Sequence, residues 1–304
     1  RMCKWIQFGG IGLLLMCLSC TPGLRERNKN IEDASDKRTS ETLQLKKSLH
    51  GMPSRGFMFG HQDATVYGIG WDGDSGRSDV RSVTGDYPAV VGFDLGRIEL
   101  GHESNLDNVS FHRMREEIIR HYERGGMVTV SWHADNPVTG GDSWDVEGEK
   151  VVASILAGGE QHELFVGWLE TVANYFNSLV TPSGTKIPVL FRPWHEHTQT
   201  WNWWGRKCAT DEEFVELWRF TIKYLRDVKG IHNMIYAISP QMDEVYENTR
   251  ERLTFRWPGD EFVDFIGMDC YHGRNHAALK SNLETLSKLS KEKGKPFGIT
   301  EMGI

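Results

Sequence analysis

Residues 191–205 hold a dense collection of chemically useful side chains. The stretch Phe-Arg-Pro-Trp-His-Glu-His-Thr-Gln-Thr-Trp-Asn-Trp-Trp-Gly contains one acid, two histidines, an arginine and four tryptophans. A carboxyl group such as that of Glu196 can act as a general acid or base when a substrate lies within hydrogen-bonding distance. We therefore expect chemistry in this stretch more than anywhere else in the chain.

The four tryptophans indicate what kind of substrate this would be. Indole rings provide flat apolar platforms with a polar edge, and sugar rings expose C–H patches that stack on such faces. The alternative is that Glu196 is a solvated loop carboxylate and the tryptophans are ordinary core. Four tryptophans in one loop favour a carbohydrate site.

Short apolar strands must position these side chains. Residues 187–191 form a predicted buried strand that Pro193 terminates, so Glu196 emerges at its carboxyl end. Similar runs alternate with amphipathic helices, whose apolar stripes include Phe111 to Tyr122, Phe165 to Phe176 and Phe214 to Leu225, the last preceded by a capping box at Thr210. The seven predicted strands are residues 57–60, 90–93, 127–132, 187–191, 234–238, 262–268 and 296–300.

Polar residues follow every one of these strands. The alternation of strands and helices is typical of a parallel α/β architecture. In a (β/α)8 TIM barrel the carboxyl ends of the strands converge on one face, where the active site lies. A doubly wound sheet would concentrate its site at one switch point, and the sequence has no glycine-rich phosphate-binding motif to support one. We therefore predict a (β/α)8 barrel.

The motif Arg192-Pro193-Trp194-His195-Glu196, followed by Trp201, Trp203 and Trp204, resembles glycoside hydrolase family 26. The resemblance extends from about Gly56 to Glu301. It implies that Glu196 is the acid/base and Glu301 the nucleophile. It also implies that His133, His195, Trp201, Trp204 and Tyr271 bind or shape the sugar site, although one of the adjacent Trp203 and Trp204 is expected to turn into the core.

Glu196 and Glu301 each follow a predicted strand, so both should open on the same face of the barrel. A retaining glycosidase needs one carboxylic acid to protonate the departing oxygen and a second carboxylate to attack the anomeric carbon, about 5–5.5 Å away. The residues alone do not assign the two roles, and the assignment comes from the resemblance.

The resemblance also supplies the substrate. The best-known members of the family are β-mannanases, so the expected reaction is cleavage of internal β-1,4 bonds in mannan, glucomannan or galactomannan. Alternatives are an exo-acting mannobiohydrolase, a β-1,3-xylanase or a mixed-linkage β-glucanase. A non-catalytic polysaccharide-binding lipoprotein is the alternative of another class, against which the presence of both carboxylates argues.

A metal-dependent hydrolase is a further alternative, because barrel enzymes often place histidines at strand ends. Its ligands would come from a set of six residues: His61, Asp63, His133, Asp135, His195 and His197. The spacing gives little support, since no His-x-His follows the first strand. We expect no metal and no cofactor.

The first residues indicate export. Arg1 and Lys4 precede an apolar run of about fourteen residues, too short for the roughly 20 that span a bilayer. Residues 1–20 therefore form a lipoprotein-type signal peptide, with a lipid anchor expected on Cys20. Residues 21–47 are polar and read as a tether, and residues 48–304 as the catalytic barrel. The protein would be membrane-anchored, periplasmic or on the cell surface.

Charge and cysteine content limit the remaining possibilities. A formal net charge of −7 with no cluster of Lys and Arg gives no electrostatic footprint for nucleic acid, and a monomer is expected. Cys208 and Cys270 could pair or remain thiols. The chain stops three residues after Glu301, before any eighth strand, so we expect an incomplete barrel that is poorly soluble and inactive alone.

Overall fold

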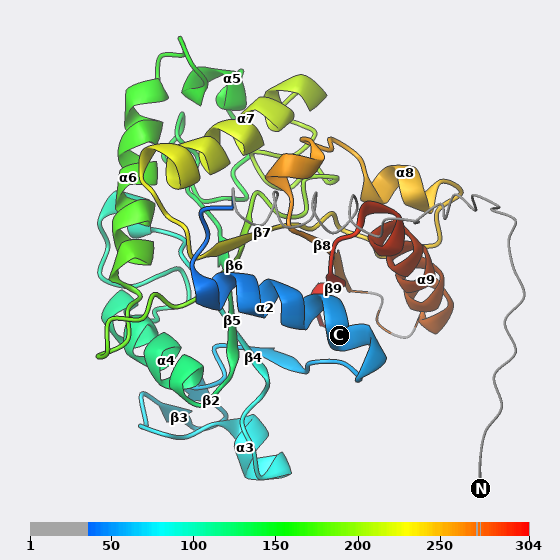
Figure 1. Cartoon of the computed structure of the whole chain (residues 1–304). Helices are drawn as coiled ribbons and strands as arrows, with labels where there is room; N and C mark the ends of the chain where they lie inside the picture. Colours follow the sequence, from blue (N-terminus) through cyan, green and yellow to red (C-terminus); the bar gives the residue numbers. More distant parts are fainter. Residues whose placement is uncertain (1–35, 272, 274, 304) are drawn as a thin grey trace, which may run out of the picture. The chain divides into compact units, whose positions relative to one another are not determined.

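Seven parallel strands form the main sheet of the protein. The computed structural model describes residues 36–271, 273 and 275–303. The strand order is β1-β4-β5-β6-β7-β8-β9, so neighbours in the sheet are also consecutive along the chain, and a separate hairpin pairs β2 with β3 (Figure 1). The strands are β1 Gly60–Gln62, β2 Tyr67–Gly68, β3 Trp71–Asp72, β4 Val90–Asp94, β5 Met127–Trp132, β6 Val189–Pro193, β7 Met234–Ile238, β8 Phe265–Cys270 and β9 Phe297–Met302.

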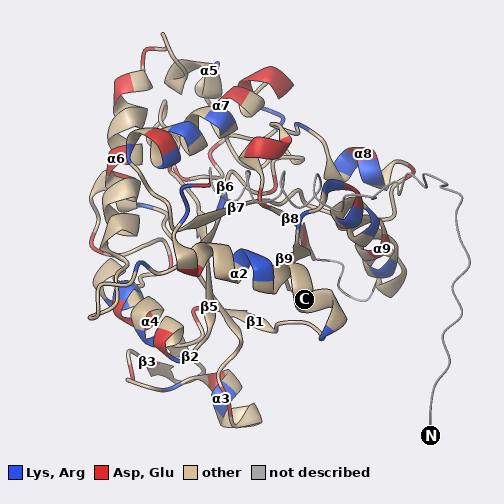
Figure 2. Cartoon of the chain, in the orientation of Figure 1, with Lys and Arg blue, Asp and Glu red and all other residues tan. Residues whose placement is uncertain are grey.

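Helices connect successive strands, as expected for right-handed βα units. The α-helices are α2 Ser40–Gly51, α3 Asp79–Thr84, α4 Phe111–Glu123, α5 Val151–Ile155, α6 His162–Ser178, α7 Asp211–Lys223, α8 Thr249–Leu253 and α9 His276–Lys293. Shorter turns are η1 Met52–Ser54, η2 Ile98–Leu100, η3 Tyr224–Val228 and η4 Asp260–Phe262. The predicted capping box of α7 is confirmed, since both reciprocal hydrogen bonds between Thr210 and Glu213 form. The acidic first turn of α7 is red in Figure 2.

All seven predicted strands are present, with boundaries shifted by two or three residues in β1, in β8 and in the central β6, which runs from Val189 to Pro193 rather than over residues 187–191. The first strand begins at Gly60 rather than residue 57, because pairing with β4 runs only from Gly60↔Val90 to Gln62↔Gly92. Phe57 and Phe59, expected in or beside that strand, are exposed. The strand expected from Phe262 begins at Phe265, since Phe262 closes the turn η4. The order and parallel pairing agree with a (β/α)8 barrel of which seven strands are described.

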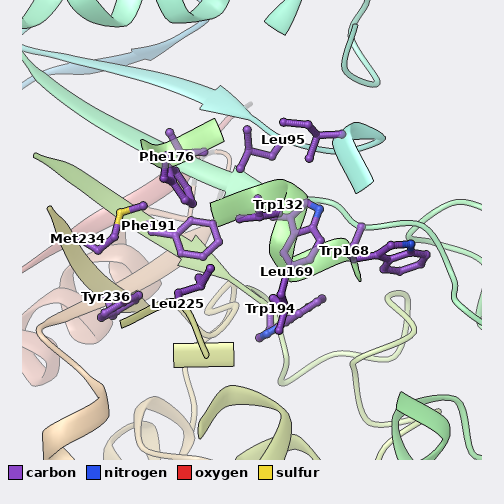
Figure 3. Packing of buried hydrophobic residues seen from close by; sticks show 14 of the residues in the cluster. Leu95, Trp132, Trp168, Leu169, Phe176, Phe191, Trp194, Leu225, Met234 and Tyr236 are labelled. Atoms are coloured by element: carbon purple, nitrogen blue, oxygen red, sulfur yellow. The ribbon is translucent and has the colours of Figure 1, made fainter. Parts of the chain in front are cut away.

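The core lies between the sheet and the helices that follow its strands (Figure 3). Trp132 at the end of β5 and Trp194 just after β6 are fully buried, with ring centroids 5.0 Å apart. Phe191 and Phe176 join β6 to α6 in an edge-to-face contact of 4.9 Å. Burying an aromatic side chain of this size stabilises the fold by roughly 1.5–3 kcal/mol. The aromatic core therefore fixes the strand end from which Glu196 projects.

The prediction of a flexible tether over residues 21–47 is wrong for the last part of that segment. Arg38–Ile304 forms one compact unit, and helix α2 begins inside the expected tether with Thr39 as its N-cap. Arg38 and Lys46 both pair with the buried Asp264, at 2.7 and 3.0 Å. These residues looked like a tether because most of them are polar, although Leu45 of this segment packs, with Leu49, against a core cluster that includes Leu190 and Ile235. The predicted signal peptide, Cys20 and residues 21–35 lie outside the described residues.

Two further findings concern the remaining expectations. Cys208 and Cys270 are both buried free thiols, so the disulfide that was left open does not form. Across residues 36–303, where described, no helix has the length and apolar character needed to cross a bilayer.

Candidate active site

The carboxyl ends of β4, β5, β6, β8 and β9 supply the polar side chains of one connected cluster. Hydrogen bonds link Asp94 to His133, His133 to His195, and Arg192 to both Asp269 and Glu301. Parallel strands in consecutive order bring these ends together, as the sequence predicts.

The loop that carries Glu196 has an unusual backbone. Trp194 and Glu196 have φ angles of 53° and 55°, in the left-handed region that costs a non-glycine residue roughly 1–2 kcal/mol. The surrounding structure holds this conformation: the Glu196 amide donates to the Ser239 carbonyl at 2.8 Å, and the Trp194 indole donates to Thr221 Oγ1 at 3.1 Å. Strain of this kind is concentrated at functional sites.

The carboxyl group of Glu196 lies in a dry, acidic environment. Only 8% of the residue is exposed, and its Oε2 accepts a hydrogen bond from the indole of Trp201 at 2.9 Å. Burial, and then the negative charge of Glu301, raise the pKa of Glu196 above its ordinary value. Glu196 therefore tends to keep its proton, as a general acid requires.

Glu301 lies among hydrogen-bond donors instead. Arg192 Nη2 donates to its Oε2 at 2.7 Å, and the hydroxyl of Tyr271 donates to its Oε1. Arg192 is itself held by Asp269 at 2.9 Å and by the carbonyl of Thr300 at 3.0 Å. Such donors stabilise a negative carboxylate and fix its direction. Glu301 has the partners that a carboxylate nucleophile needs.

Two histidines lie beside this pair. His133 Nδ1 donates to Asp94 at 2.7 Å, and its Nε2 lies 3.1 Å from Nε2 of His195. Burial opposes the charged form of His133, but Asp94 prevails and raises the pKa of that imidazole. Burial, together with the charges of His133 and Arg192, holds the pKa of His195 well below its usual value. His195 is therefore neutral and buried, and it contacts the more exposed ring of His133.

The tryptophans divide into one exposed ring and three buried ones. Trp201 is 38% exposed beside Glu196, consistent with the expected sugar contact. Trp204 is fully buried, so the expectation that it binds substrate is wrong. Its indole donates to the carbonyl of His195 at 2.7 Å, and therefore it orients the loop. Trp194 and Trp203 are equally buried.

Several functional residues were missed in the sequence. Trp144, in the loop after β5, is 46% exposed and stacks on His133 with centroids 5.1 Å apart, which makes it a second aromatic platform. Arg192 and Asp269 were visible as residues of strand ends, but their pairing across the barrel was not. Asp94 also ends a predicted strand. Its hydrogen bond to His133 could not be predicted, because the two residues lie 39 positions apart and on different strands.

Of the six residues named for the alternative of a metal-dependent hydrolase, only His195 belongs to a group of described acids and histidines close enough to share an ion. Among the described residues, the group of acids and histidines close enough to share an ion is His195, Asp269 and Glu301. The guanidinium of Arg192 bonds to both carboxylates, so a positive charge already occupies their centre. This donor set fits a buried ion pair better than a metal.

Known proteins are similar to this chain in sequence and in fold. Residues 34–303 match the sequence profile of glycosyl hydrolase family 26. A mannan endo-1,4-beta-mannosidase of Bifidobacterium adolescentis is 33% identical over 90% of the chain, and one of Bacillus subtilis is 26% identical over 74%. The chain spans 28% and 60% of the length of these two relatives.

Solved structures agree with this match. A GH26 beta-mannanase from Bacteroides ovatus superposes with a TM-score of 0.84 at 48% identity, over 88% of this chain and 77% of that one. A modular endo-beta-1,4-mannanase from Cellulomonas fimi gives a TM-score of 0.80 at 36% identity, over 88% and 61%.

Proposed function

Because the chain belongs to glycosyl hydrolase family 26, we propose that it hydrolyses internal β-1,4-mannosidic bonds of mannan, glucomannan or galactomannan with retention of configuration. The observation that carries this proposal is the contrast between Glu196, whose pKa is raised by burial and by the charge of Glu301, and Glu301, whose two oxygens accept hydrogen bonds from Arg192 and Tyr271. Different environments for two carboxyl groups support Glu196 as the acid and Glu301 as the nucleophile. The names of the relatives support mannan as the substrate.

The reaction follows from these two environments. Glu196 gives its proton to the departing glycosidic oxygen while Glu301 attacks the anomeric carbon and forms a covalent glycosyl intermediate. Glu196, now ionised, takes a proton from water, which releases the sugar with its original configuration. Trp201 beside Glu196 and Trp144 beside His133 offer their exposed faces to sugar rings.

Variants of the two carboxyl groups test the mechanism. General acid catalysis is worth roughly 10²–10⁴ in rate, so Glu196→Ala should slow hydrolysis of mannan by about that factor and an activated aryl mannoside by less. Glu301→Ala should abolish turnover of both. Glu123→Ala, at an exposed position at the end of α4, is the matched control and should retain full activity. A first-formed product of inverted anomeric configuration, detected by nuclear magnetic resonance, would exclude retention.

Product analysis separates the alternatives. Internal cleavage of mannohexaose gives mixed products early, whereas an exo-acting mannobiohydrolase releases mannobiose from the start. Degradation of β-1,3-xylan or mixed-linkage β-glucan with no action on mannan would overturn the mannan assignment. Binding of mannan without release of reducing ends would support the non-catalytic alternative.

We also propose that the protein is exported and anchored by lipid on Cys20. The apolar run ahead of Cys20 supports this proposal. Labelled palmitate should enter the protein but not the Cys20→Ala variant. Unchanged membrane fractionation of that variant, together with no labelling of the parent, would reject the anchor.

A further inference from the structure

Tyr271 touches Glu301 but has little packing of its own. It is the first residue after β8, and 44% of it is exposed. A side chain in such a place has many rotamers open to it, and only one of them brings the hydroxyl to Glu301. Something other than burial must therefore hold it.

A chain of polar side chains reaches the backbone of Tyr271 from the loop of the other catalytic residue. Asp243 Oδ1 accepts the backbone N–H of Tyr271 at 2.6 Å, and its Oδ2 accepts the side-chain amide of Gln241. Gln241 Oε1 in turn accepts Nε2 of Gln199 at 2.5 Å. The backbone N–H of Gln199 donates to the carbonyl of Glu196 at 3.0 Å.

We propose that Gln199, Gln241 and Asp243 form a positioning relay that holds Tyr271 against Glu301 and couples it to the loop of Glu196. This inference rests on the proposed glycosidase function. None of the three side chains hydrogen-bonds to Glu196 or Glu301 side-chain atoms in the described contacts, so they are positioning residues that act through Tyr271.

The relay has a defined direction. A carboxylate only accepts hydrogen bonds, so Asp243 forces the N–H₂ end of Gln241 toward itself and the carbonyl end toward Gln199. Gln241 is almost fully buried, and Thr198 fixes its backbone through bonds of 3.1 and 3.3 Å. A reversal of one member would place two donors, or two acceptors, face to face.

This direction gives a specific test. Asp243→Asn presents an N–H₂ group to the N–H₂ group of Gln241, and Gln241→Glu presents a carboxylate to the carboxylate of Asp243, so each change breaks the relay. The double variant Asp243→Asn/Gln241→Glu restores one donor opposite one acceptor and also the net charge. Glu244→Gln is the matched control, because it removes a neighbouring exposed charge outside the relay.

We expect each single relay variant to lower kcat on mannohexaose by about tenfold or more with little change in KM, since misplacement of reacting groups by about 1 Å can cost 10²-fold. The double variant should recover most of this loss. In a Tyr271→Phe background, Asp243→Asn should add little, because the hydroxyl that the relay positions is gone. Equal kcat for Asp243→Asn and Glu244→Gln, or no recovery in a double variant that unfolds at the parental temperature, would overturn the relay.

Hydrogen exchange separates this inference from the proposed function. Exchange at the Tyr271 amide should be faster in Asp243→Asn, restored in the double variant and unchanged in Glu244→Gln. This result would support the relay even if the parent protein proved inactive on mannan, which would count against the proposed function alone. An amide protected equally in all four proteins would overturn the relay.

Discussion

Glu196 and Glu301 are the same residue type at the carboxyl ends of two strands, and their neighbours give them different environments. The difference is produced by burial around Glu196 and by the donors Arg192 and Tyr271 around Glu301. Because each carboxyl group lies within the field of the other, a change at one should be measurable at the other.

Replacing Glu301 should alter the titration of Glu196. In Glu301→Gln the like charge that disfavours ionisation is gone, so the pKa of Glu196 should fall toward its ordinary value. Carboxyl ¹³C resonances titrated by nuclear magnetic resonance measure this in a protein that needs no activity. Burial remains the larger cause, so the fall should be incomplete, and a rise would contradict the description of the site.

Trp201 should have the opposite effect on Glu196. Trp201→Phe keeps an aromatic face for the sugar but removes the N–H that donates to Glu196 Oε2. Since that hydrogen bond favours the carboxylate, its loss should raise the pKa of Glu196 further and move the alkaline limb of the pH profile of kcat/KM upward. Trp144→Phe, which has no such bond to Glu196, should leave the limb in place.

At the scale of elements, helix α2 is joined to the sheet by ion pairs as well as by the packing of Leu45 and Leu49. Asp264 stands just before β8, where it pairs with Arg38 and Lys46 and accepts the backbone N–H of Tyr236 at 3.1 Å. Burial opposes ionisation of Asp264, but Arg38 and Lys46 outweigh it and lower the pKa of that carboxyl. A depressed pKa in the folded state means that the pair stabilises the fold above the ordinary pKa of aspartate.

Asp264→Asn should therefore destabilise the protein by about 3–5 kcal/mol at neutral pH, since it leaves two cations without their partner. The difference in free energy of unfolding from the parent should persist down to about pH 4, the ordinary pKa of aspartate. It should shrink at lower pH, where Asp264 of the parent also becomes protonated. Urea unfolding from pH 3 to pH 7 tests this, with Glu123→Gln as an exposed control that should change little.

The elements differ in how well the sequence predicts them. β5 and β7 match their predicted bounds because apolar, buried residues dominate both strands. Helix α2 was missed because few of its residues are apolar and its ion-pair partner Asp264 lies more than 200 positions away. The same distinction holds at the site. Glu196 and Glu301 could be placed by the strand ends they follow, but the burial of Trp204 and the pairing of Arg192 with Asp269 depend on contacts across the barrel.

At the scale of the whole molecule, the described sheet has two free edges. β1 and β9 stand at opposite ends of the strand order, and each pairs with one neighbour. Phe57 beside β1 and Met302 in β9 are exposed, by 86% and 62%. Unpaired strand edges with apolar side chains favour association between molecules.

Pairing the free edges of β1 and β9 should stabilise the protein. We expect residues 1–304 followed by a designed strand and helix that pair with β9 and β1 to unfold at a higher temperature, and to hydrolyse mannan faster, than residues 1–304 alone. The control is the same extension with two prolines in the strand, which removes backbone donors and should give no gain. Equal melting temperatures and hydrolysis rates for all three proteins would show that the free edges reduce neither stability nor activity.

The start of the compact unit, at Arg38 and helix α2, lies at the end of the sheet away from Glu196 and Glu301. Arg38 and Thr39 bond to Met234 and His232, at the amino-terminal ends of the strands, while Glu196 and Glu301 stand at the carboxyl ends. A chain held by lipid at Cys20 would thus enter the barrel from the side opposite its catalytic mouth. The residues from Thr21 to Lys37 can span at most about 60 Å, at roughly 3.3–3.6 Å each. If the proposed anchor holds, a chain of that length would let the enzyme reach polysaccharide within a few nanometres of the bilayer.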